Sequence, residues 1–389
     1  MFNLHEYFLL DPSVTFLNHA SFGATPKPVF SEYQRWQREL ETQPVEFLGR
    51  RITSLMAESR ATLGNYLGTH ADNLVYTQNV TISLNIVARS LELGPHDEVL
   101  TTDHEYGAMD RTWRFLSKER GFRYVSRPVK TPLVSEEDFV QDFWCGVTSQ
   151  TRVIFISHIT SPTAMIFPVR EILRRAREAG IVTIIDGAHV PGQISLHLDS
   201  LGADFYVGNL HKWLCAPKGA GFLYARPEMQ PLLKPLVVSW GYEAEMPGSS
   251  EFIDHHEWWG TRDMSAFLSV PAAIAFQEEH DWEKVRNACH ELARDAQQRI
   301  CEITRLAPLH AAPQADHWFR QMFTAPLPAD TDIVTLKTRL YNEHRIEVPL
   351  LEWNRNKLIR VSVQGYNTAE DLDKLCSALS LLVNERISK

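Results

Sequence analysis

An acidic residue and a lysine stand at the ends of two strand-like segments in the middle of the chain. Asp186 follows the apolar run 181–185, and Lys212 comes 26 residues later, close behind a second apolar run. An amine can hold an aldehyde as a Schiff base, and a carboxylate can keep a pyridine nitrogen protonated so that the ring takes up electrons. Either residue alone would be ordinary, but together they predict pyridoxal 5'-phosphate (PLP) as the cofactor.

The size and charge of the chain limit the kinds of protein that it can be. Its 389 residues predict two packed domains, or one large domain with a smaller one. A net charge of −9 argues against binding of nucleic acid or an anionic membrane surface, and no apolar run approaches the ~20 residues of a membrane helix. The five cysteines form no Cys-x-x-Cys pair, and the first residues do not resemble a secretory signal. We therefore expect a cytoplasmic protein with reduced thiols.

Strand-like and helix-like segments alternate from about residue 74 to residue 225. The expected strands are apolar at nearly every position, which is typical of a largely parallel sheet covered by helices on both faces. One intervening helix opens at Pro168 and ends at Gly180. Ligands bind such sheets beyond the carboxyl ends of the strands, which is where Asp186 and Lys212 fall. The expected strands cover residues 74–77, 98–101, 122–125, 153–156, 182–186, 205–207 and 221–224.

The pattern changes after about residue 265. A long helical stretch over 265–304, broken near His280, comes first. Thr368 and Asp371 are spaced as in a capping box, and apolar residues then recur on one face of a final helix. These features predict an α+β domain. Its expected strands cover residues 319–323, 346–348 and 358–363.

Eight motifs spread along the chain resemble those of the class V aminotransferases, a family of fold type I PLP enzymes, and within it the isopenicillin N epimerase-like branch. The resemblance implies an α/β, PLP-dependent transferase-like fold, with a mostly parallel seven-stranded sheet, helices on both faces and a smaller α+β C-terminal domain. We expect an N-terminal segment 1–15 that packs on the site, a large PLP-binding domain 16–265 and a small domain 266–389. The motifs cover residues 16–23, 77–81, 104–108, 157–163, 186–189, 211–212, 259–263 and 360–368.

The resemblance also implies roles for residues around the reacting centre. Lys212 would hold the cofactor and later shuttle the α-proton of the substrate, and Asp186 would pair with the pyridinium. His189 matches the position that contacts the 3'-oxygen of the ring. Arg360 would clamp the substrate carboxylate. Asn18 and His19 are expected to contact the substrate as well.

Further residues are expected to hold the cofactor's phosphate and ring. Val80 and Thr81 open the helix after the first strand, so their amides could cradle a phosphate, and Asn209 and His211 flank the lysine. The alternative for Thr81 is an ordinary role as a helix N-terminal residue. By resemblance, Tyr106 would stack on the ring, and Thr261 would reach the phosphate of a neighbouring subunit, which implies a homodimer with shared active sites.

Other kinds of chemistry lack their motifs in this sequence. There is no dinucleotide-binding or Walker-type glycine loop, no Gly-x-Ser-x-Gly and no His-Glu-x-x-His. The run 254–257 (Asp-His-His-Glu) offers metal-ligand types, but neighbours on a strand point to opposite faces. We therefore expect no metal and interpret this run as a substrate-specificity loop leading into Trp258 and Trp259.

The predicted function is a reaction at the α-carbon of an amino acid bound to PLP as an external aldimine. The branch favours an epimerase or racemase, with Tyr106 or His19 as candidates for a second base. A PLP-dependent C–S β-lyase and a class V aminotransferase remain alternatives, as does a catalytically silent PLP-fold binding protein. A cysteine desulfurase is disfavoured because the segment 345–359, before the strand of Arg360, contains no cysteine.

Overall fold

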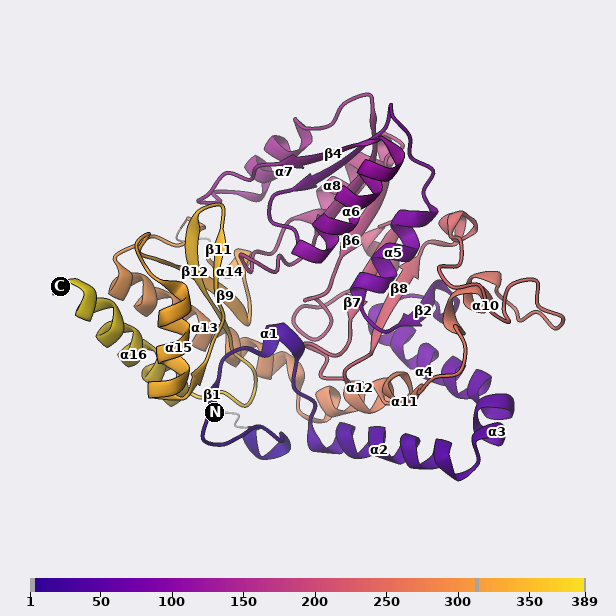
Figure 1. Ribbon diagram of the computed structural model, residues 1–389, viewed down its shortest axis with the longest axis horizontal. Helices are drawn as coiled ribbons and strands as arrows, with labels where there is room; N and C mark the ends of the chain where they lie inside the picture. The colour runs from indigo at the N-terminus through magenta and orange to yellow at the C-terminus, as the bar shows by residue number, and fades with distance from the viewer. Residues whose placement is uncertain (1–3, 312–314, 388–389) are drawn as a thin grey trace.

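The computed structural model describes residues 4–311 and 315–387, which form a large layered region and a smaller one beside it (Figure 1). The large region is built on a seven-stranded sheet with strand order β2-β8-β7-β6-β5-β3-β4. Neighbouring strands from β4 to β7 pair in parallel, whereas β8 is antiparallel to both β7 and β2. The mostly parallel sheet is therefore confirmed. The strands are β2 (Leu74–Thr77), β3 (Glu98–Thr102), β4 (Arg123–Arg127), β5 (Thr151–Ser157), β6 (Val182–Asp186), β7 (Phe205–Asn209) and β8 (Gly221–Ala225).

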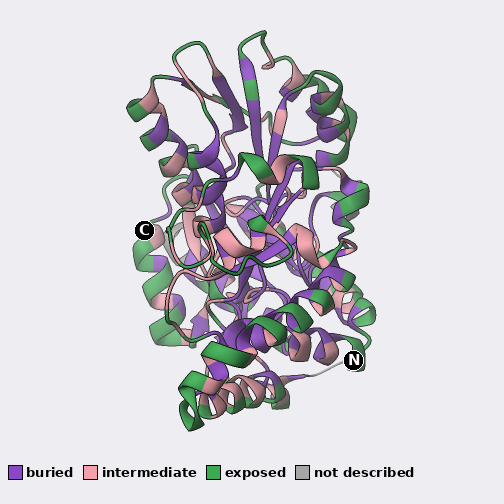
Figure 2. Cartoon of the chain, turned by 90° about the vertical axis from the view of Figure 1, so that its right-hand side faces the viewer, coloured by how far each residue is buried: buried purple, intermediate pink, exposed green. Residues whose placement is uncertain are grey.

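Helices cover both faces of this sheet because successive residues of its strands are apolar on both sides. In β5, Ile154 belongs to one hydrophobic cluster and Phe155 to a second one, and both side chains are completely buried. Helices α5 and α6 pack on the second cluster, and α7 and α8 lie on the opposite face. Figure 2 shows the buried strands between helices whose outer faces are exposed. The helices are α5 (Val80–Ser90), α6 (Gly107–Arg120), α7 (Glu136–Trp144), α8 (Val169–Glu178) and α9 (Leu198–Leu201).

The smaller region is an antiparallel three-stranded sheet with strand order β11-β12-β9, packed against helices. The expected strand 319–323 was wrong at its start, since β9 begins only at Met322, where it pairs with Ser362. The backbone N–H of Thr368 donates to Asp371 Oδ2 at 3.1 Å, which is one half of the expected capping box. Strand β11 was not predicted. The elements are β9 (Met322–Leu327), β10 (Ile346–Glu347), β11 (Leu350–Trp353), β12 (Asn356–Ser362), α13 (Trp282–Thr304), α14 (Ala315–Trp318), α15 (Ile333–His344) and α16 (Ala369–Ile387).

The N-terminal part of the chain touches both regions. Strand β1 (Thr15–Phe16) pairs in parallel with β10, and the N–H of Leu4 donates to the carbonyl of Gly365. The first three residues of the expected segment 1–15 lie outside the described residues. Helices α11 and α12 pack on α2 and α4, whereas α13 packs on β9 and α16. These helices are α1 (His19–Phe22), α2 (Lys27–Thr42), α3 (Pro44–Glu46), α4 (Ile52–Leu67), α11 (Ser265–Leu268) and α12 (Val270–Glu279).

The run 254–257 does not lie on a strand or in a loop, as the sequence had suggested. It belongs to helix α10 (Glu251–Glu257), which begins at the Ser250 cap. Glu257 at its end forms a buried ion pair with Arg60 of α4 at 2.6 Å. Its carboxylate therefore fixes α10 to the large region, and the expectation of a loop at 254–257 was wrong because the run is helical.

Candidate active site

A pocket of about 360 Å³ opens at the carboxyl ends of β5, β6 and β7. Its volume falls within the range of small-ligand sites. The pocket brings together eight of the predicted site residues from four segments that are far apart in the sequence. These residues are Val80, Thr81, Tyr106, Asp186, His189, Asn209, His211 and Lys212.

Asp186 and Lys212 are positioned by adjacent parallel strands. Asp186 is the last residue of β6, where its Oδ1 accepts from the Ala188 N–H at 2.9 Å. Lys212 follows β7 in a turn, and its Nζ lies 3.2 Å from His189 Nε2. Burial raises the pKa of Asp186 and lowers that of Lys212, although the opposite charges of the pair counteract both shifts.

The first turn of α5 forms another wall of the pocket. Asn79 caps this helix by accepting from the Ile82 N–H at 3.1 Å. The N–H of Val80 donates to Asn209 Oδ1 at 3.1 Å, which leaves the amide group of Asn209 available as a donor. The Val80 N–H is thus occupied, contrary to the expectation that it binds the phosphate, whereas the Asn209 amide and the positive end of the helix dipole remain suited to a phosphate.

His211 is less suited to an anion than the sequence suggested. Its Nδ1 lies 2.9 Å from the carbonyl of Ala220, so it carries a hydrogen and donates to that oxygen. Burial lowers the pKa of His211 to about 4, so the ring is neutral and its Nε2 is an acceptor. His211 could donate to a phosphate only after protonation, which its burial opposes.

Arg360 of β12 is buried behind the pocket without a carboxylate partner among the described residues. Its Nη1 donates to the carbonyl and hydroxyl of Ser161 at 2.6 and 3.1 Å, and Nη2 donates to Ser21 Oγ at 3.2 Å. Nε has no partner, and burial lowers the pKa of the guanidinium to about 10. Both serines line the pocket, so Arg360 places an uncompensated positive charge at its edge.

Asn18 and His19 lie beside the pocket rather than in its lining. Asn18 Nδ2 donates to Glu347 Oε1 at 3.0 Å, and its Oδ1 accepts from Ser21, which in turn binds Arg360. His19 is fully buried, with Nε2 3.0 Å from the carbonyl of Lys212. Both side chains therefore form hydrogen bonds to residues that line the pocket, Ser21 and Lys212, without lining it themselves.

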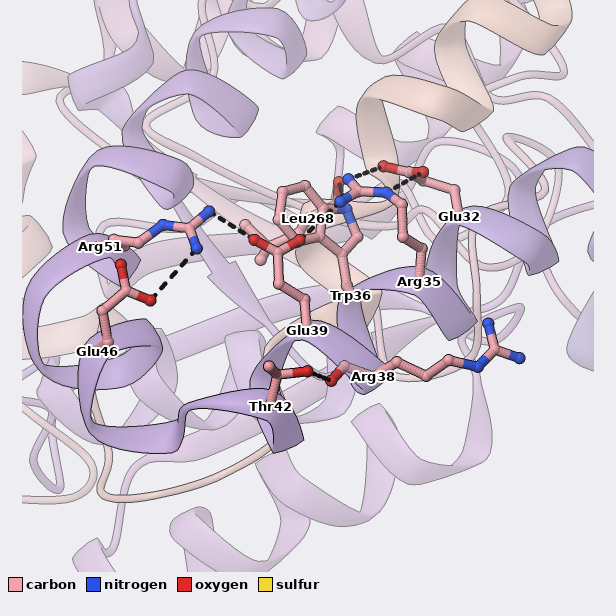
Figure 3. A network of polar contacts seen from close by, with 9 residues as sticks. All are labelled: Glu32, Arg35, Trp36, Arg38, Glu39, Thr42, Glu46, Arg51 and Leu268. Atoms are coloured by element: carbon pink, nitrogen blue, oxygen red, sulfur yellow. Dashed lines mark hydrogen bonds and ion pairs between the residues drawn. The ribbon is translucent and has the colours of Figure 1, made fainter.

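Tyr106 and Thr261 are the most exposed of the predicted residues. Tyr106 precedes α6 and lines the pocket with about half of its surface exposed. Thr261 is exposed and does not line the pocket of its own chain. Its segment is fixed to α2, because Gln37 Nε2 donates to Asp263 Oδ2 at 3.0 Å. A network of ion pairs lies along the outer side of the same helix (Figure 3).

Two residues of the site region were missed by the sequence analysis. Glu105 is buried, accepts from the N–H and Oγ of Ser157 and from Thr102 Oγ1, and so fixes the loop that carries Tyr106. Trp213 is fully buried, and its indole donates to His189 Nδ1 at 3.3 Å. Each is adjacent in sequence to a predicted site residue, but only their burial and contacts distinguish them.

These residues fit PLP. A buried amine and a buried carboxylate share one pocket, a capped helix N-terminus with a nearby amide donor suits a phosphate, and the buried Nε of Arg360 lacks a partner. The donor set therefore matches a molecule with an aldehyde, a basic ring nitrogen and a phosphate, together with a substrate that carries a carboxylate. The described residues contain no group of three or more side chains that could hold a metal ion.

The fold and the site are those of a PLP-dependent enzyme, and comparison with known proteins identifies the family. The chain belongs to the aminotransferase class-V family, whose model matches residues 15–375. It is 35% identical over 393 residues to isopenicillin N epimerase of Amycolatopsis lactamdurans, covering 98% of each chain. It is 32% identical to isopenicillin N epimerase of Streptomyces clavuligerus (97% of each chain), and 28% to putative L-cysteine desulfhydrase 1 of Oryza sativa subsp. japonica (96% of this chain, 84% of the relative).

Solved structures share this fold. A mutant of C-DES with glycine covalently linked to its PLP cofactor superposes with a TM-score of 0.83 at 20% identity, covering 97% of this chain and 98% of that one. Cysteine desulfurase from Thermococcus onnurineus NA1 gives a TM-score of 0.82 at 19% identity, with 98% of each chain covered. The protein is thus a PLP-dependent enzyme of the class V family with the fold type I architecture, which confirms the predicted family, fold, enzyme class and cofactor. Within its described part, no helix is long and apolar enough to cross a membrane.

Proposed function

We propose that this enzyme is an epimerase or racemase that acts at the α-carbon of an amino acid. The placement of Lys212, Asp186 and the unpaired Arg360 around one pocket is the observation that carries the proposal of chemistry at the α-carbon. The full-length similarity to two isopenicillin N epimerases supports the choice of reaction.

PLP, when bound, supplies an electron sink that stabilises negative charge at the α-carbon of the substrate. Asp186 would hold the ring nitrogen protonated, and the N-terminus of α5 with Asn209 would hold the phosphate. His189 would contact the 3'-oxygen of the ring. Arg360 would bind the substrate carboxylate, which fixes the orientation of the α-carbon.

Lys212 would hold the cofactor and then move a proton at the α-carbon. Burial lowers the pKa of its amine from the ordinary lysine value toward neutrality, so a fraction of the amine is a base under physiological conditions. Epimerisation also requires a proton on the opposite face. Of the two candidates for a second base, only Tyr106 lines the pocket.

The cysteines argue against a mechanism that uses an enzyme thiol. Among the described residues, Cys215 is the cysteine that contacts the site region, with its Sγ 3.9 Å from His19 Nε2. Its side chain is fully buried, and burial raises its pKa to about 12, so it is not a nucleophile at neutral pH. A desulfurase-type persulfide is therefore disfavoured.

A β-lyase is the second candidate, because β-elimination needs no enzyme thiol. Several L-cysteine desulfhydrases resemble the chain over nearly its full length, at 25–28% identity. The same lysine, aspartate and arginine would serve a lyase. The two reactions differ in what happens to a leaving group on the β-carbon.

The deciding experiment is incubation of the PLP-loaded enzyme with a panel of L-amino acids in deuterated water. An epimerase gives both enantiomers with deuterium at the α-carbon and no keto acid. Pyruvate with ammonia and sulfide would replace the proposal by a lyase, and a pyridoxamine form restored by a keto acid would replace it by an aminotransferase. Lys212→Ala should abolish both the reaction and the visible absorbance of the bound cofactor.

We further propose that the enzyme works in the cytoplasm as a homodimer with shared active sites. All five cysteines are free, which suits a reducing compartment. Trp240 and Met246 are more than four-fifths exposed in the segment before α10, an apolar surface that suits a second copy. Sedimentation should give twice the 44.5 kDa of one chain. A monomer that binds PLP normally would contradict the dimer.

A further inference from the structure

His189 lies between an indole and an amine in the wall of the pocket. The Nε1–H of Trp213 donates to His189 Nδ1 at 3.3 Å, and His189 Nε2 lies 3.2 Å from Lys212 Nζ. Trp213 is fully buried and His189 nearly so. An indole nitrogen can only donate, so Nδ1 must present its lone pair, and the hydrogen of the neutral ring must be on Nε2.

The ring is held neutral by its surroundings. Burial keeps the pKa of His189 well below its ordinary value, and the positive charge of Arg360 lowers it further. With a hydrogen on Nε2, the ring can bind Lys212 only as a donor. The amine must then accept through its own lone pair, which exists only in the uncharged form.

We propose that Trp213 is a positioning residue that fixes the Nε2–H tautomer of His189 and thereby holds Lys212 as a free amine. The inference rests on the proposed function in taking Lys212 as the cofactor lysine. A free amine is the form that reacts, because its lone pair makes the new C–N bond to the cofactor aldehyde while the aldehyde oxygen leaves as water.

The other groups that face Lys212 do not reverse this effect. The charge of Arg360 disfavours the charged amine and that of Asp186 favours it, and neither effect depends on a tautomer. His211 and His19 are neutral, because burial lowers their pKa values to about 4 and about 3. Among the described residues, His189 is the histidine within hydrogen-bond distance of the Lys212 amine, so its tautomer decides whether it donates to the amine or accepts from it.

The test uses the protein freed of PLP and measures the rate of cofactor uptake from its visible absorbance over a range of pH. In Trp213→Phe, His189 can carry its hydrogen on Nδ1 and accept from a protonated lysine. The midpoint of the rate profile should then move upward by about one pH unit. NMR of isotope-labelled histidine reads the tautomer directly, and the signals of His189 are assigned by their loss in His189→Asn.

Two controls separate this role from a packing defect. Trp318→Phe also shortens a buried indole, but Trp318 Nε1 has no partner among the described residues, so the profile should stay in place. In a His189→Asn background, Trp213→Phe should no longer move the midpoint, because asparagine has no tautomers.

An unmoved midpoint in folded Trp213→Phe, or a hydrogen on Nδ1 in the unmodified protein, would overturn the inference. The NMR measurement decides the question even if the variant does not fold. Visible absorbance that persists in Lys212→Ala would instead overturn the proposed function. The two failures are therefore distinguishable.

Discussion

The charged side chains of the pocket and those along α2 differ in both burial and pairing. On α2, Arg35 pairs with Glu32 and Glu39 at 2.6 and 2.7 Å, and Arg35 is about half exposed (Figure 3). At the site, Asp186 lines the pocket and Arg360 lies behind it; both are buried, and neither has an ion-pair partner among the described residues.

This difference distinguishes charged residues that belong to the protein surface from charged residues that are kept to bind a ligand. Exposed pairs cost little desolvation and contribute little stability. Buried charges without partners cost stability, and a protein retains them where a ligand supplies the missing partner. The lack of partners at Asp186 and Arg360 is therefore stronger evidence for a site than any paired charge on the surface.

The largest effect should follow from removing the pocket carboxylate. Asp186→Ala should lower kcat on the order of 10³-fold, because a buried ionic partner of the ring nitrogen is lost. Steady-state kinetics checks this, with Glu39→Ala on α2 as the control that should leave kcat unchanged. A similar loss of kcat in Asp186→Ala and Glu39→Ala would show that the pocket and the surface of α2 do not differ in their importance for catalysis.

Removal of the buried guanidinium comes next. Arg360→Met keeps the length of the side chain but not its donors, and should lower kcat/KM for amino acids about 10²-fold. The same change at Arg35 should have no effect on kcat/KM. Full activity of Arg360→Met would show that another group binds the carboxylate.

Glu105 provides a test based on pH. Burial raises its pKa to about 7, so between about pH 4.5 and 7 the folded protein binds a proton at Glu105 that the unfolded chain does not. The contribution of Glu105 to stability is present at the acidic end and is lost as the pH rises through 7. Glu105→Gln should remove about 1–3 kcal/mol of this pH dependence.

Denaturant unfolding of both proteins at pH 5 and pH 7.5 measures the effect. Glutamine can still accept from Ser157 and can donate to Thr102, so the fold should be kept. Glu39→Gln on the surface is the matched control. Parallel pH profiles for Glu105→Gln and the unmodified protein would show that Glu105 is ionised throughout.

The smallest effect should come from the surface network. Arg35→Gln should change the free energy of unfolding by less than about 1 kcal/mol, and salt should reduce even this change. Urea unfolding at low and high salt checks both statements. A loss above about 2 kcal/mol would show that the network on α2 is structurally important.

Much of the fold could be predicted because periodicity along the chain reports burial. The apolar strands predicted a sheet covered on both faces, and β5 indeed buries alternate residues in two clusters. Asp186 and Lys212 were found because strand ends in such a sheet meet at one edge. Strand β11 was missed because its pattern is mixed, and the run 254–257, which was interpreted as a loop, belongs to a helix held by a distant arginine.

The sequence by itself determined the sheet, the family and the cofactor, and it pointed to Asp186 and Lys212 as site residues, since these follow from local pattern and motif. Only the tertiary structure decided which buried charges lack an ion-pair partner and where Glu105 and Trp213 lie. It also decided that His19 contacts the backbone carbonyl of Lys212 rather than the pocket. The physical reason is that burial and hydrogen-bond partners depend on residues hundreds of positions apart, such as Ser21 and Arg360, and no local pattern records that distance.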